Sequence, residues 1–296
     1  MTGRLRPSDE VRGALDRDDP LVALETSVIS HGLPHPWNFR AAQEMEQAVR
    51  QEGATPAWTW VGGGSLHLGA TRGELASLAG GGAKVARRDL PAVLAGLGLG
   101  GTTVSATLWS AHAAGIEVVV TGGIGGVHPG SGDVSADLAE LARTPGTLVC
   151  SGPKSIVNPG ATLERLEELG VGVIGYGCDR LPFFLVRETE FPVEHRADDP
   201  EAVAAISRAR AELGLRSSVL VCNPVPAAAA LPADIVAGAV SLCTERAGGE
   251  GIVGKDLTPF LLSCLAEQTG GASLEANLAL LVGNARLAAR IAAAMA

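Results

Sequence analysis

A glycine-rich stretch of the sequence, residues 121–155, gathers side chains of the kinds that perform chemistry in enzymes. It holds a histidine, two carboxylates, a hydroxyl and a lysine, namely His128, Asp133, Asp137, Ser135 and Lys154. Side chains of these types transfer protons, hold ions and act as nucleophiles. Each alone is an ordinary polar loop residue, but the five together indicate a functional site.

Two apolar runs with the composition of β-strands, residues 116–121 and 147–150, are expected to position this stretch. Each run ends abruptly in small residues, at 121–123 and 151–153. Ligands of open α/β sheets bind outside the carboxyl ends of the strands, so both loops are expected to face a ligand. The glycines between them let the backbone approach that ligand closely.

Polar residues follow other predicted strands as well. Glu25 comes directly after the short apolar run 21–24, and Asn223 follows the run 218–222. Asn277 lies among leucines of the predicted last helix, as either a buried polar residue with a partner or a ligand contact.

Two other features have two interpretations each. Residues 101–103 begin a predicted helix and are either an anion site or an ordinary threonine cap. The basic cluster 84–89 is expected to be a surface face.

The alternation of strand-like and helix-like segments predicts the α/β class. We expect a single domain, with a mostly parallel central sheet flanked by helices and a helical C-terminal part. Its boundaries are expected at residues 20–296, after a polar, poorly ordered N-terminal lead-in at residues 1–19 that has at most one helical turn.

Composition excludes several classes of protein. The 296 residues carry a net charge of −9 and show no basic patch, so a nucleic-acid partner is not expected. No apolar N-terminal region and no run of roughly 20 apolar residues is apparent, so neither a signal peptide nor a membrane span is expected. The five cysteines form no CxxC pair and predict buried free thiols in a reducing cytoplasm.

Two glycine motifs fail on inspection. Residues 249–255 resemble a phosphate loop, but Asp256 stands where a serine or threonine must bind magnesium. The run 121–126 lacks the dinucleotide fingerprint, because His128 occupies the place of its third glycine.

Eight motifs in order give the sequence a resemblance to one family. They are LETSVISHGLP (24–34), KVARRDLP (84–91), GTTVSAT (101–107), TGGIGGVH (121–128), DVSADL (133–138), SGPKSI (151–156), NPVP (223–226) and GKDLTPFLL (254–262). Together they resemble the pseudouridine-5′-phosphate glycosidase family over about residues 20–295.

The resemblance implies a reaction and its partners. Members of this family make and break the C–C bond between ribose 5-phosphate and C5 of uracil. They use a divalent metal, typically manganese (Mn²⁺), and assemble as homotrimers with an α/β fold.

The resemblance also implies residue roles. Lys154 matches the lysine that forms an imine with C1′ of the ring-opened sugar, Glu25 the carboxylate that moves protons, and Asp133 the metal-binding aspartate. Contacts to the sugar phosphate are implied for Lys84, Thr103, Val104 and His128. A substrate-binding run near the metal is implied for Ser135, Ala136 and Asp137, and contact with the edge of the base for Asn277.

These roles are chemically consistent. A C–C glycosidic bond has no leaving oxygen to protonate, so the two-carboxylate scheme of glycoside hydrolases does not fit. An amine on C1′ supplies an electron sink beside the bond. Burial is expected to raise the pKa of Glu25, which suits a proton shuttle.

The sequence departs from the family in the metal loop and around the expected base site. Only the four residues 129–132 separate His128 from Asp133, three fewer than is usual. Trp37 and Gly283 stand where polar residues are usual, and Phe183 and Phe184 add bulk. We expect these four residues near the base or a lid, with Trp37 either stacked on the acceptor or packed on the domain.

Three functions follow. One is pseudouridine-5′-phosphate glycosidase, and a second is a C-ribosyl synthase of C-nucleoside antibiotic pathways that joins ribose 5-phosphate to another carbon nucleophile. The third, a non-catalytic binder of sugar phosphates, would need neither Lys154 nor Glu25.

Overall fold

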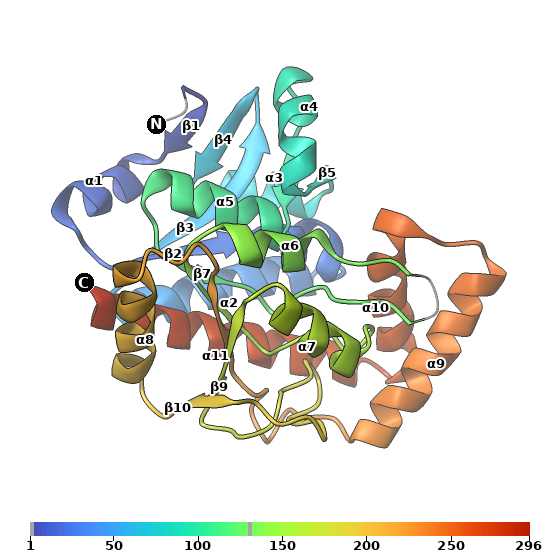
Figure 1. Ribbon diagram of the computed structural model, residues 1–296. Helices are drawn as coiled ribbons and strands as arrows, with labels where there is room; N and C mark the ends of the chain where they lie inside the picture. Colours follow the sequence, from blue (N-terminus) through green and yellow to red (C-terminus); the bar gives the residue numbers. More distant parts are fainter. Residues whose placement is uncertain (1–2, 130–131) are drawn as a thin grey trace.

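A mostly parallel sheet forms the centre of the fold in the computed structural model, which describes residues 3–129 and 132–296 (Figure 1). Its strands are β1 (Leu5–Pro7), β2 (Leu21–Glu25), β3 (Thr55–Gly62), β4 (Ser65–Leu68), β5 (Ala83–Val85), β6 (Gly100–Thr102), β7 (Val118–Val120), β8 (Thr147–Cys150), β9 (Gly172–Tyr176), β10 (His195–Ala197) and β11 (Val219–Cys222). They lie in the order β1-β4-β3-β2-β7-β8-β11-β9-β10, and β6 joins β3 to β5. Within the described residues the pairings β3–β4 and β3–β6 are antiparallel and the other ladders are parallel.

Helices cover both faces of this sheet, as predicted for the α/β class. They are α1 (Asp9–Arg17), α2 (Trp37–Gln51), α3 (Arg72–Ala79), α4 (Leu90–Ala95), α5 (Val104–Ala114), α6 (Ala136–Arg143), α7 (Pro159–Glu168), α8 (Pro200–Glu212), α9 (Ala233–Gly249), α10 (Leu257–Gln268) and α11 (Ala272–Met295), with single turns η1 (Val28–Gly32), η2 (Arg87–Asp89) and η3 (Gly254–Asp256). Successive strand residues point to opposite faces. Val22 and Leu24 therefore pack with α2, α8 and α11, whereas Ala23 packs with α1, α5, α6 and α7.

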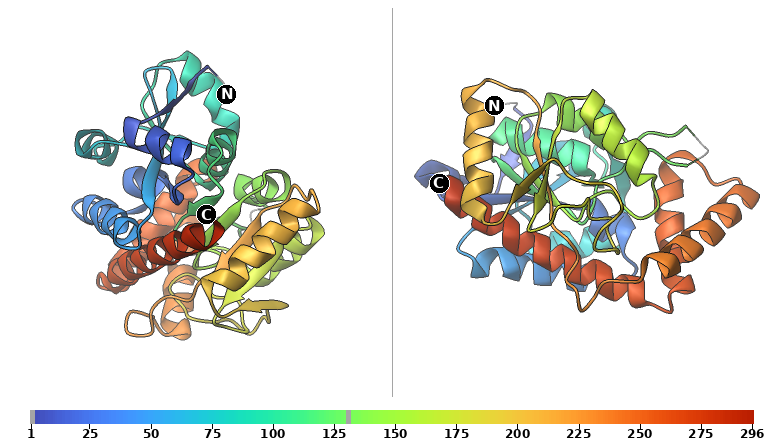
Figure 2. Two further views of the ribbon diagram at one scale, coloured as in Figure 1. Left: turned by 90° about the vertical axis from the view of Figure 1, so that its left-hand side faces the viewer. Right: turned by 60° about the horizontal axis from the view of Figure 1, so that its bottom comes forward.

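The last helix, α11, is the core helix of one face. It has 24 residues and is apolar enough to cross a membrane by length and composition, which the sequence analysis did not anticipate. Its buried side chains pack against α2, α8 and the strands β7 and β8 (Figures 1 and 2). It also buries two asparagines, Asn277 and Asn284. These contacts are those of a core helix.

The N-terminal segment is part of the sheet, so the prediction of a poorly ordered lead-in is wrong. β1 pairs with β4 in parallel register, from Leu5 opposite Leu66 to Pro7 opposite Leu68. Ser8 caps α1 through its side chain, and Val11 of α1 is fully buried. The polar composition of this segment gave no indication that it is ordered, because only one face of α1 is apolar.

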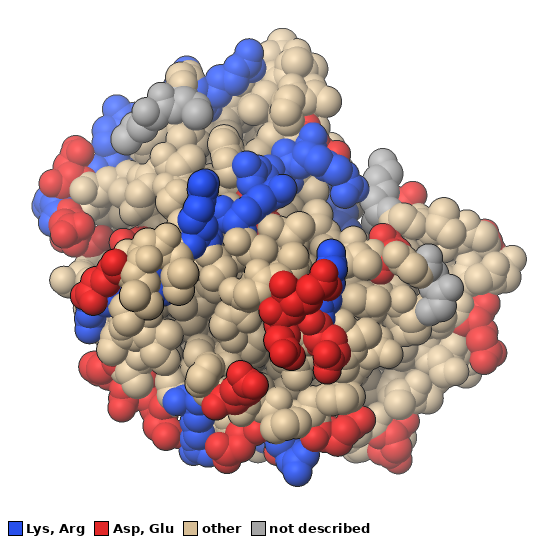
Figure 3. All heavy atoms as spheres, viewed as in Figure 1, with Lys and Arg blue, Asp and Glu red and all other residues tan. Residues whose placement is uncertain are grey.

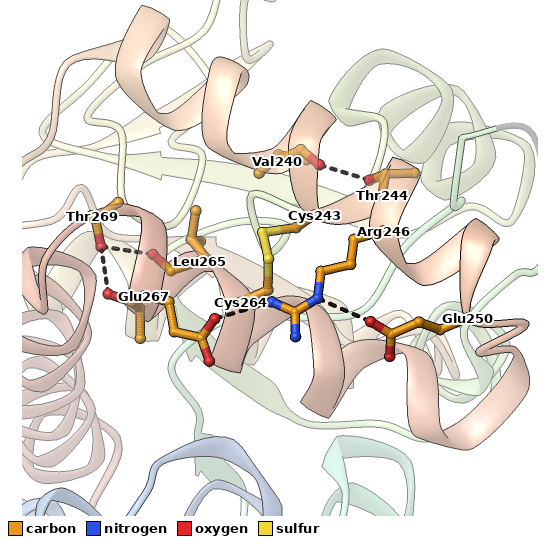
Figure 4. The surroundings of a disulfide bond; sticks show 10 residues. Val240, Cys243, Thr244, Arg246, Glu250, Cys264, Leu265, Glu267 and Thr269 are labelled. Atoms are coloured by element: carbon orange, nitrogen blue, oxygen red, sulfur yellow. Dashed lines mark hydrogen bonds and ion pairs between the residues drawn. A yellow bond between two sulfur atoms is a disulfide. The ribbon is translucent and has the colours of Figure 1, made fainter.

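Two cysteines form a disulfide, so the prediction that all five are free thiols is wrong. Cys243 of α9 and Cys264 of α10 are bonded, with a Cα–Cα distance of 5.7 Å (Figure 4). Beside them Arg246 bonds Glu250 and Glu267, which ties the same two helices from outside. Cys150, Cys178 and Cys222 are free, as expected.

The predicted basic cluster 84–89 is divided between the surface and the interior. Figure 3 shows lysine and arginine side chains in a band over α5 and α6, with acidic side chains gathered below over α7. Arg87 bonds the fully buried Glu140 at 2.7 Å, and Arg143 bonds the same carboxylate at 2.6 Å. Arg88 is 72% exposed, whereas Lys84 turns into a pocket. The cluster is therefore not a uniform surface face.

Candidate active site

The strand order brings together polar residues that are far apart in the sequence. β2, β7, β8 and β11 are consecutive neighbours and run parallel. Their carboxyl ends therefore meet at one edge of the sheet, where Glu25, Thr121, Ser151 and Asn223 stand. The structure therefore brings the predicted strand ends together at one edge of the sheet.

A pocket opens at this edge. It is lined by Glu25, Ser27, Val28, His31, Gly32, Lys84, Gly122, Gly123, Lys154, Phe184, Thr258, Pro259, Leu262 and Asn277. Four residues proposed from the sequence therefore share one cavity: Glu25, Lys84, Lys154 and Asn277. The pocket is closed on one side by α10, the helix that carries half of the disulfide.

Glu25 is a buried carboxylate at the base of the pocket. Its Oε1 accepts a hydrogen bond from Thr121 Oγ1 at 2.8 Å, and Ser27 Oγ lies 3.4 Å from Oε2. Burial raises the pKa of Glu25 above its ordinary value, while the positive charge of Lys154 and the bond from Thr121 act in the opposite direction. The expectation that burial raises this pKa is confirmed.

Two lysines face this carboxylate. Burial is the main cause that lowers the pKa of Lys84, and the charge of Lys154 lowers it further; Asp137 and Glu25 oppose this. Lys154 is held by its backbone, since its N–H donates to Ile124 O at 2.9 Å and its carbonyl accepts from Val157 at 3.0 Å. A carboxylate and two amines therefore share a partly desolvated space.

Asn277 reaches the pocket from the first half of α11. Its side chain is 6% exposed, and its Oδ1 has no hydrogen-bond partner among the described residues. A buried carbonyl oxygen without a donor costs free energy. A ligand that brings an N–H or O–H group would remove this cost.

His128 and Asp133 flank the shortened loop, in which residues 130 and 131 lie outside the described part of the chain. His128 N–H donates to Asp133 O at 2.9 Å. Burial lowers the pKa of His128; Asp133 raises it, and the charges of Lys154 and Lys84 lower it. Both lysine charges thus act on His128, although His128 does not line the pocket.

The remaining predicted substrate contacts lie where the N-termini of α5 and α6 meet. Thr103 stands at the N-cap position of α5 without a side-chain capping bond, and Val104 is the first residue of that helix. Ser135 caps α6 ahead of Ala136. Asp137 joins the two helices, because its carboxylate accepts from Ser105 N–H at 3.2 Å and from Gly125 N–H at 3.0 Å. These residues do not line the pocket that contains Glu25 and Lys154. They adjoin it through Lys84, because β5 and β6 pair and Thr103 N–H donates to Val85 O at 2.9 Å.

The pocket wall includes His31, which was given no role from the sequence alone, and Phe184, which was expected near the base. His31 follows β2 within η1, and its Nδ1 lies 2.7 Å from Ser30 Oγ. Phe184 has a positive φ of 57°, a backbone strain that clusters at functional sites. Its ring lies against Gly123, where an added Cβ would stand 2.7 Å from Phe184 Cδ2. The motif SHGLP, which follows β2, is the sequence feature that could have identified His31 as a pocket residue.

Two predicted acceptor residues lie elsewhere. Trp37 and Gly283 line a separate groove between α2 and α11, together with Arg40, Pro226 and Arg286. Trp37 packs against the core, and the guanidinium of Arg40 stands 5.5 Å from its ring centre. The packing interpretation of Trp37 is therefore the right one, and the placement of both residues at the acceptor is wrong. Phe184 lines the pocket as expected, whereas Phe183 does not.

The residues present fit only one kind of metal site. Among the described residues, no cluster of three His, Cys, Asp or Glu side chains could hold an ion. Asp133 offers an exposed carboxylate beside His128. Hard divalent cations are often bound by one or two carboxylates, several waters and a substrate phosphate. Asp133 fits such a water-rich site and not a cage of protein ligands.

A buried carboxylate and two lysines around one pocket, at the carboxyl edge of an α/β sheet, are the features of an α/β enzyme. The model of the family described as "Indigoidine synthase A like protein" matches residues 10–294. The chain is 50% identical over 295 residues to the pseudouridine-5′-phosphate glycosidase of Symbiobacterium thermophilum, covering 97% of this chain and 96% of that protein. It is 50% identical over 296 residues to the pseudouridine-5′-phosphate glycosidase of Paracoccus denitrificans, covering 98% and 97%.

Two solved structures have the same fold as this chain. The prealnumycin C-glycosynthase AlnA, in complex with ribulose 5-phosphate, superposes with a TM-score of 0.91 at 38% identity, covering 100% of this chain and 98% of that chain. An indigoidine synthase A-like protein of Thermotoga maritima gives a TM-score of 0.90 at 36% identity, covering 97% and 95%. The chain belongs to the pseudouridine-5′-phosphate glycosidase family, as its sequence motifs indicated.

Proposed function

We propose that this protein is a pseudouridine-5′-phosphate glycosidase, which interconverts pseudouridine 5′-phosphate and water with uracil and ribose 5-phosphate. The observation that carries the proposal is the single pocket that holds Glu25, Lys154 and Asn277. Relatives at 50% identity over nearly the whole chain bear this name.

In the synthetic direction Lys154 supplies the electrophile. Its unprotonated amine adds to the C1′ aldehyde of ring-opened ribose 5-phosphate, and the carbonyl oxygen leaves as water, giving an imine. C5 of uracil then attacks C1′. The C4′ hydroxyl closes the ring, and the amine of Lys154 departs as the leaving group. Cleavage is the reverse sequence.

Glu25 handles the proton of the base. As a carboxylate it accepts the proton that C5 of uracil loses after attack, and as a neutral acid it returns that proton in cleavage. Its burial and its bond to Thr121 hold it in the pocket beside Lys154. The raised pKa of Glu25 brings both protonation states closer to the working pH.

The phosphate is proposed to lie where β5 and α5 meet, against Lys84, Thr103, Val104 and His128. The N-terminus of α5 and the positive charge of Lys84 support this placement, because both attract anions. The run Ser135, Ala136 and Asp137 would border the sugar from the N-terminus of α6. Asp133 would hold Mn²⁺, which supplies positive charge and ordered water next to the phosphate.

The acceptor end of the pocket favours uracil, with one alternative. Asn277 offers a buried Oδ1 that needs a donor, and an imide N–H of uracil supplies one. Phe184, Pro259 and Leu262 add apolar surface to the lining of the pocket. That apolar surface, and the similarity to AlnA, support the second candidate, a C-ribosyl synthase with a less polar carbon nucleophile.

Mass spectrometry of two matched incubations tests the proposal. The protein is incubated with ribose 5-phosphate, manganese and either uracil or a pool of small carbon nucleophiles. Formation of pseudouridine 5′-phosphate, and its cleavage in reverse, would establish the glycosidase. If no product forms with uracil but borohydride traps an adduct on Lys154, the result would favour the synthase. Sugar-phosphate binding without adduct or product would leave only the non-catalytic binder.

Assembly as a homotrimer in the cytoplasm is also proposed. α9 stands at the edge of the molecule (Figure 2) and exposes Ile235 and Leu242, each 53% exposed and two helical turns apart. Apolar side chains exposed in this way support self-association through α9. A phosphorylated sugar substrate and three free cysteines support the cytoplasm, whereas the disulfide is unusual there. Light scattering of wild type and of Ile235→Asp/Leu242→Asp tests the assembly, and a trimeric double variant would exclude α9.

A further inference from the structure

A buried asparagine on α11, Asn284, bridges three of the strand ends that form the pocket. It is fully buried, and its Nδ2 lies 3.0 Å from Thr121 O, 3.1 Å from Ser151 Oγ and 3.3 Å from Gly122 O. Its Oδ1 accepts from Asn223 Nδ2 at 3.0 Å. One amide therefore contacts the loops after β7, β8 and β11.

The loops after β7 and β8 carry the chemistry of the pocket. Thr121 Oγ1 donates to Glu25, and the next residue, Gly122, lines the pocket. Ser151 N–H donates to Gly122 O at 2.8 Å. Three residues further on stands Lys154, whose N–H donates to Ile124 O at 2.9 Å. Asn284 thus supports the loop that orients Glu25 and the loop that carries Lys154.

The amide group is needed here and no other small side chain replaces it. Carbonyl oxygens of Thr121 and Gly122 require donors, whereas Asn223 Nδ2 requires an acceptor. An aspartate has the same shape but offers acceptors only. An alanine removes the side-chain donor to Thr121 O and the acceptor for Asn223 Nδ2.

We propose that Asn284 is a positioning residue that fixes Glu25 and Lys154 relative to each other. This inference rests on the proposed function, because it assumes that these two residues act together on one substrate. Asn284 reaches no ligand itself and is absent from the pocket lining. Its effect is exerted through Thr121, Gly122 and Ser151.

The test compares Asn284→Asp and Asn284→Ala with a matched control, Leu287→Ala. Leu287 lies one turn further along α11 and is 5% exposed in the same core. Wild type and the three variants are assayed for Tm, for kcat and KM with pseudouridine 5′-phosphate, and for the rate of borohydride trapping of ribose 5-phosphate. The pH profile of kcat is measured for each.

Both Asn284 variants are expected to lose roughly 10- to 100-fold in kcat and in trapping rate, the cost of small misplacements of reacting groups, while KM changes little. Their pH profile should shift, because Thr121 no longer holds Glu25 in place. Leu287→Ala should lose Tm but keep kcat, trapping rate and pH profile per folded molecule. If the Asn284 variants lose Tm yet behave like Leu287→Ala in activity, the residue is merely structural and the proposal is overturned.

Ser151→Ala covers the case in which the Asn284 variants do not fold. It removes one hydroxyl from the bridge and should lower the trapping rate with little change in Tm; an unchanged rate would overturn the proposal. Trapping also separates the two hypotheses. A wild type that is trapped but does not act on pseudouridine 5′-phosphate refutes the glycosidase and leaves the positioning role measurable. A wild type that is neither trapped nor active refutes both.

Discussion

Reduction of the Cys243–Cys264 disulfide should destabilise the protein by a measurable amount. The two cysteines are 21 residues apart, and the entropy of closing a loop of that length corresponds to about 3 kcal/mol at 25 °C. Unfolding of a chain of 296 residues has an entropy near 0.6 kcal/mol/K on average scales, so Tm should fall by about 5 °C.

Thermal denaturation with and without a phosphine reductant is the assay. Alkylation under denaturing conditions should label three thiols before reduction and five after it, since three of the five cysteines are free. The double variant Cys243→Ser/Cys264→Ser is the control, and its Tm should be low and insensitive to reductant.

Two results would refute this reasoning. An unchanged Tm after complete reduction would mean that Arg246 and the small cluster around Ile156 and Val157 hold the helices without the bond. An equal fall in the double variant would mean that reductant acts elsewhere. Since α10 carries Thr258 and Leu262 in the pocket wall, KM for the base should rise together with the loss of Tm.

Four further predictions concern the proposed active site. Lys154→Ala should abolish the borohydride-trapped adduct with ribose 5-phosphate in intact-mass spectra; an adduct on the variant would place the nucleophile elsewhere. Asp133→Ala should make the rate insensitive to added manganese in a metal titration, and unchanged dependence would move the metal site. Burial raises the pKa of Glu25, so the stability that this group contributes is present at low pH and is lost as pH rises through its folded-state pKa. Glu25→Gln should therefore gain Tm over wild type as pH rises and match it in acid; a Tm difference independent of pH would contradict this. For the same reason the synthetic rate should fall on acidification and the cleavage rate on alkalinisation, as initial rates in both directions will show.

The strand-end residues could be predicted because their signal is local. Glu25 directly follows an apolar run, and the turn before Lys154 consists of small residues. The rule that ligands bind at the carboxyl edge of such sheets converts these local signals into a shared place. The antiparallel pair β3–β4 was predictable for a similar reason, since Gly63 and Gly64 adopt the positive φ of its turn.

What could not be predicted depends on contacts between distant segments. Cys243 and Cys264 carry no spacing motif, and only the packing of α9 on α10 brings them together. The sequence shows that residue 37 is a tryptophan, but it does not show whether the ring of Trp37 faces a ligand or packs beside Arg40. In the sequence, Asn284 is a polar residue in a largely apolar helix. Only the tertiary structure shows that its side chain contacts three strand ends.

The position of α11 in the chain has a consequence for biosynthesis. It leaves the ribosome after all the strands of the sheet, yet its side chains pack against β2, β7 and β8, which are made much earlier. A nascent chain that ends before residue 272 already contains Glu25 and Lys154 but has neither the core helix nor Asn277. Domains fold as units once their contacts are available. We therefore expect truncated translation products to be unable to fold and to be readily degraded. Degradation would prevent Lys154 of an incomplete chain from reacting with cellular aldehydes.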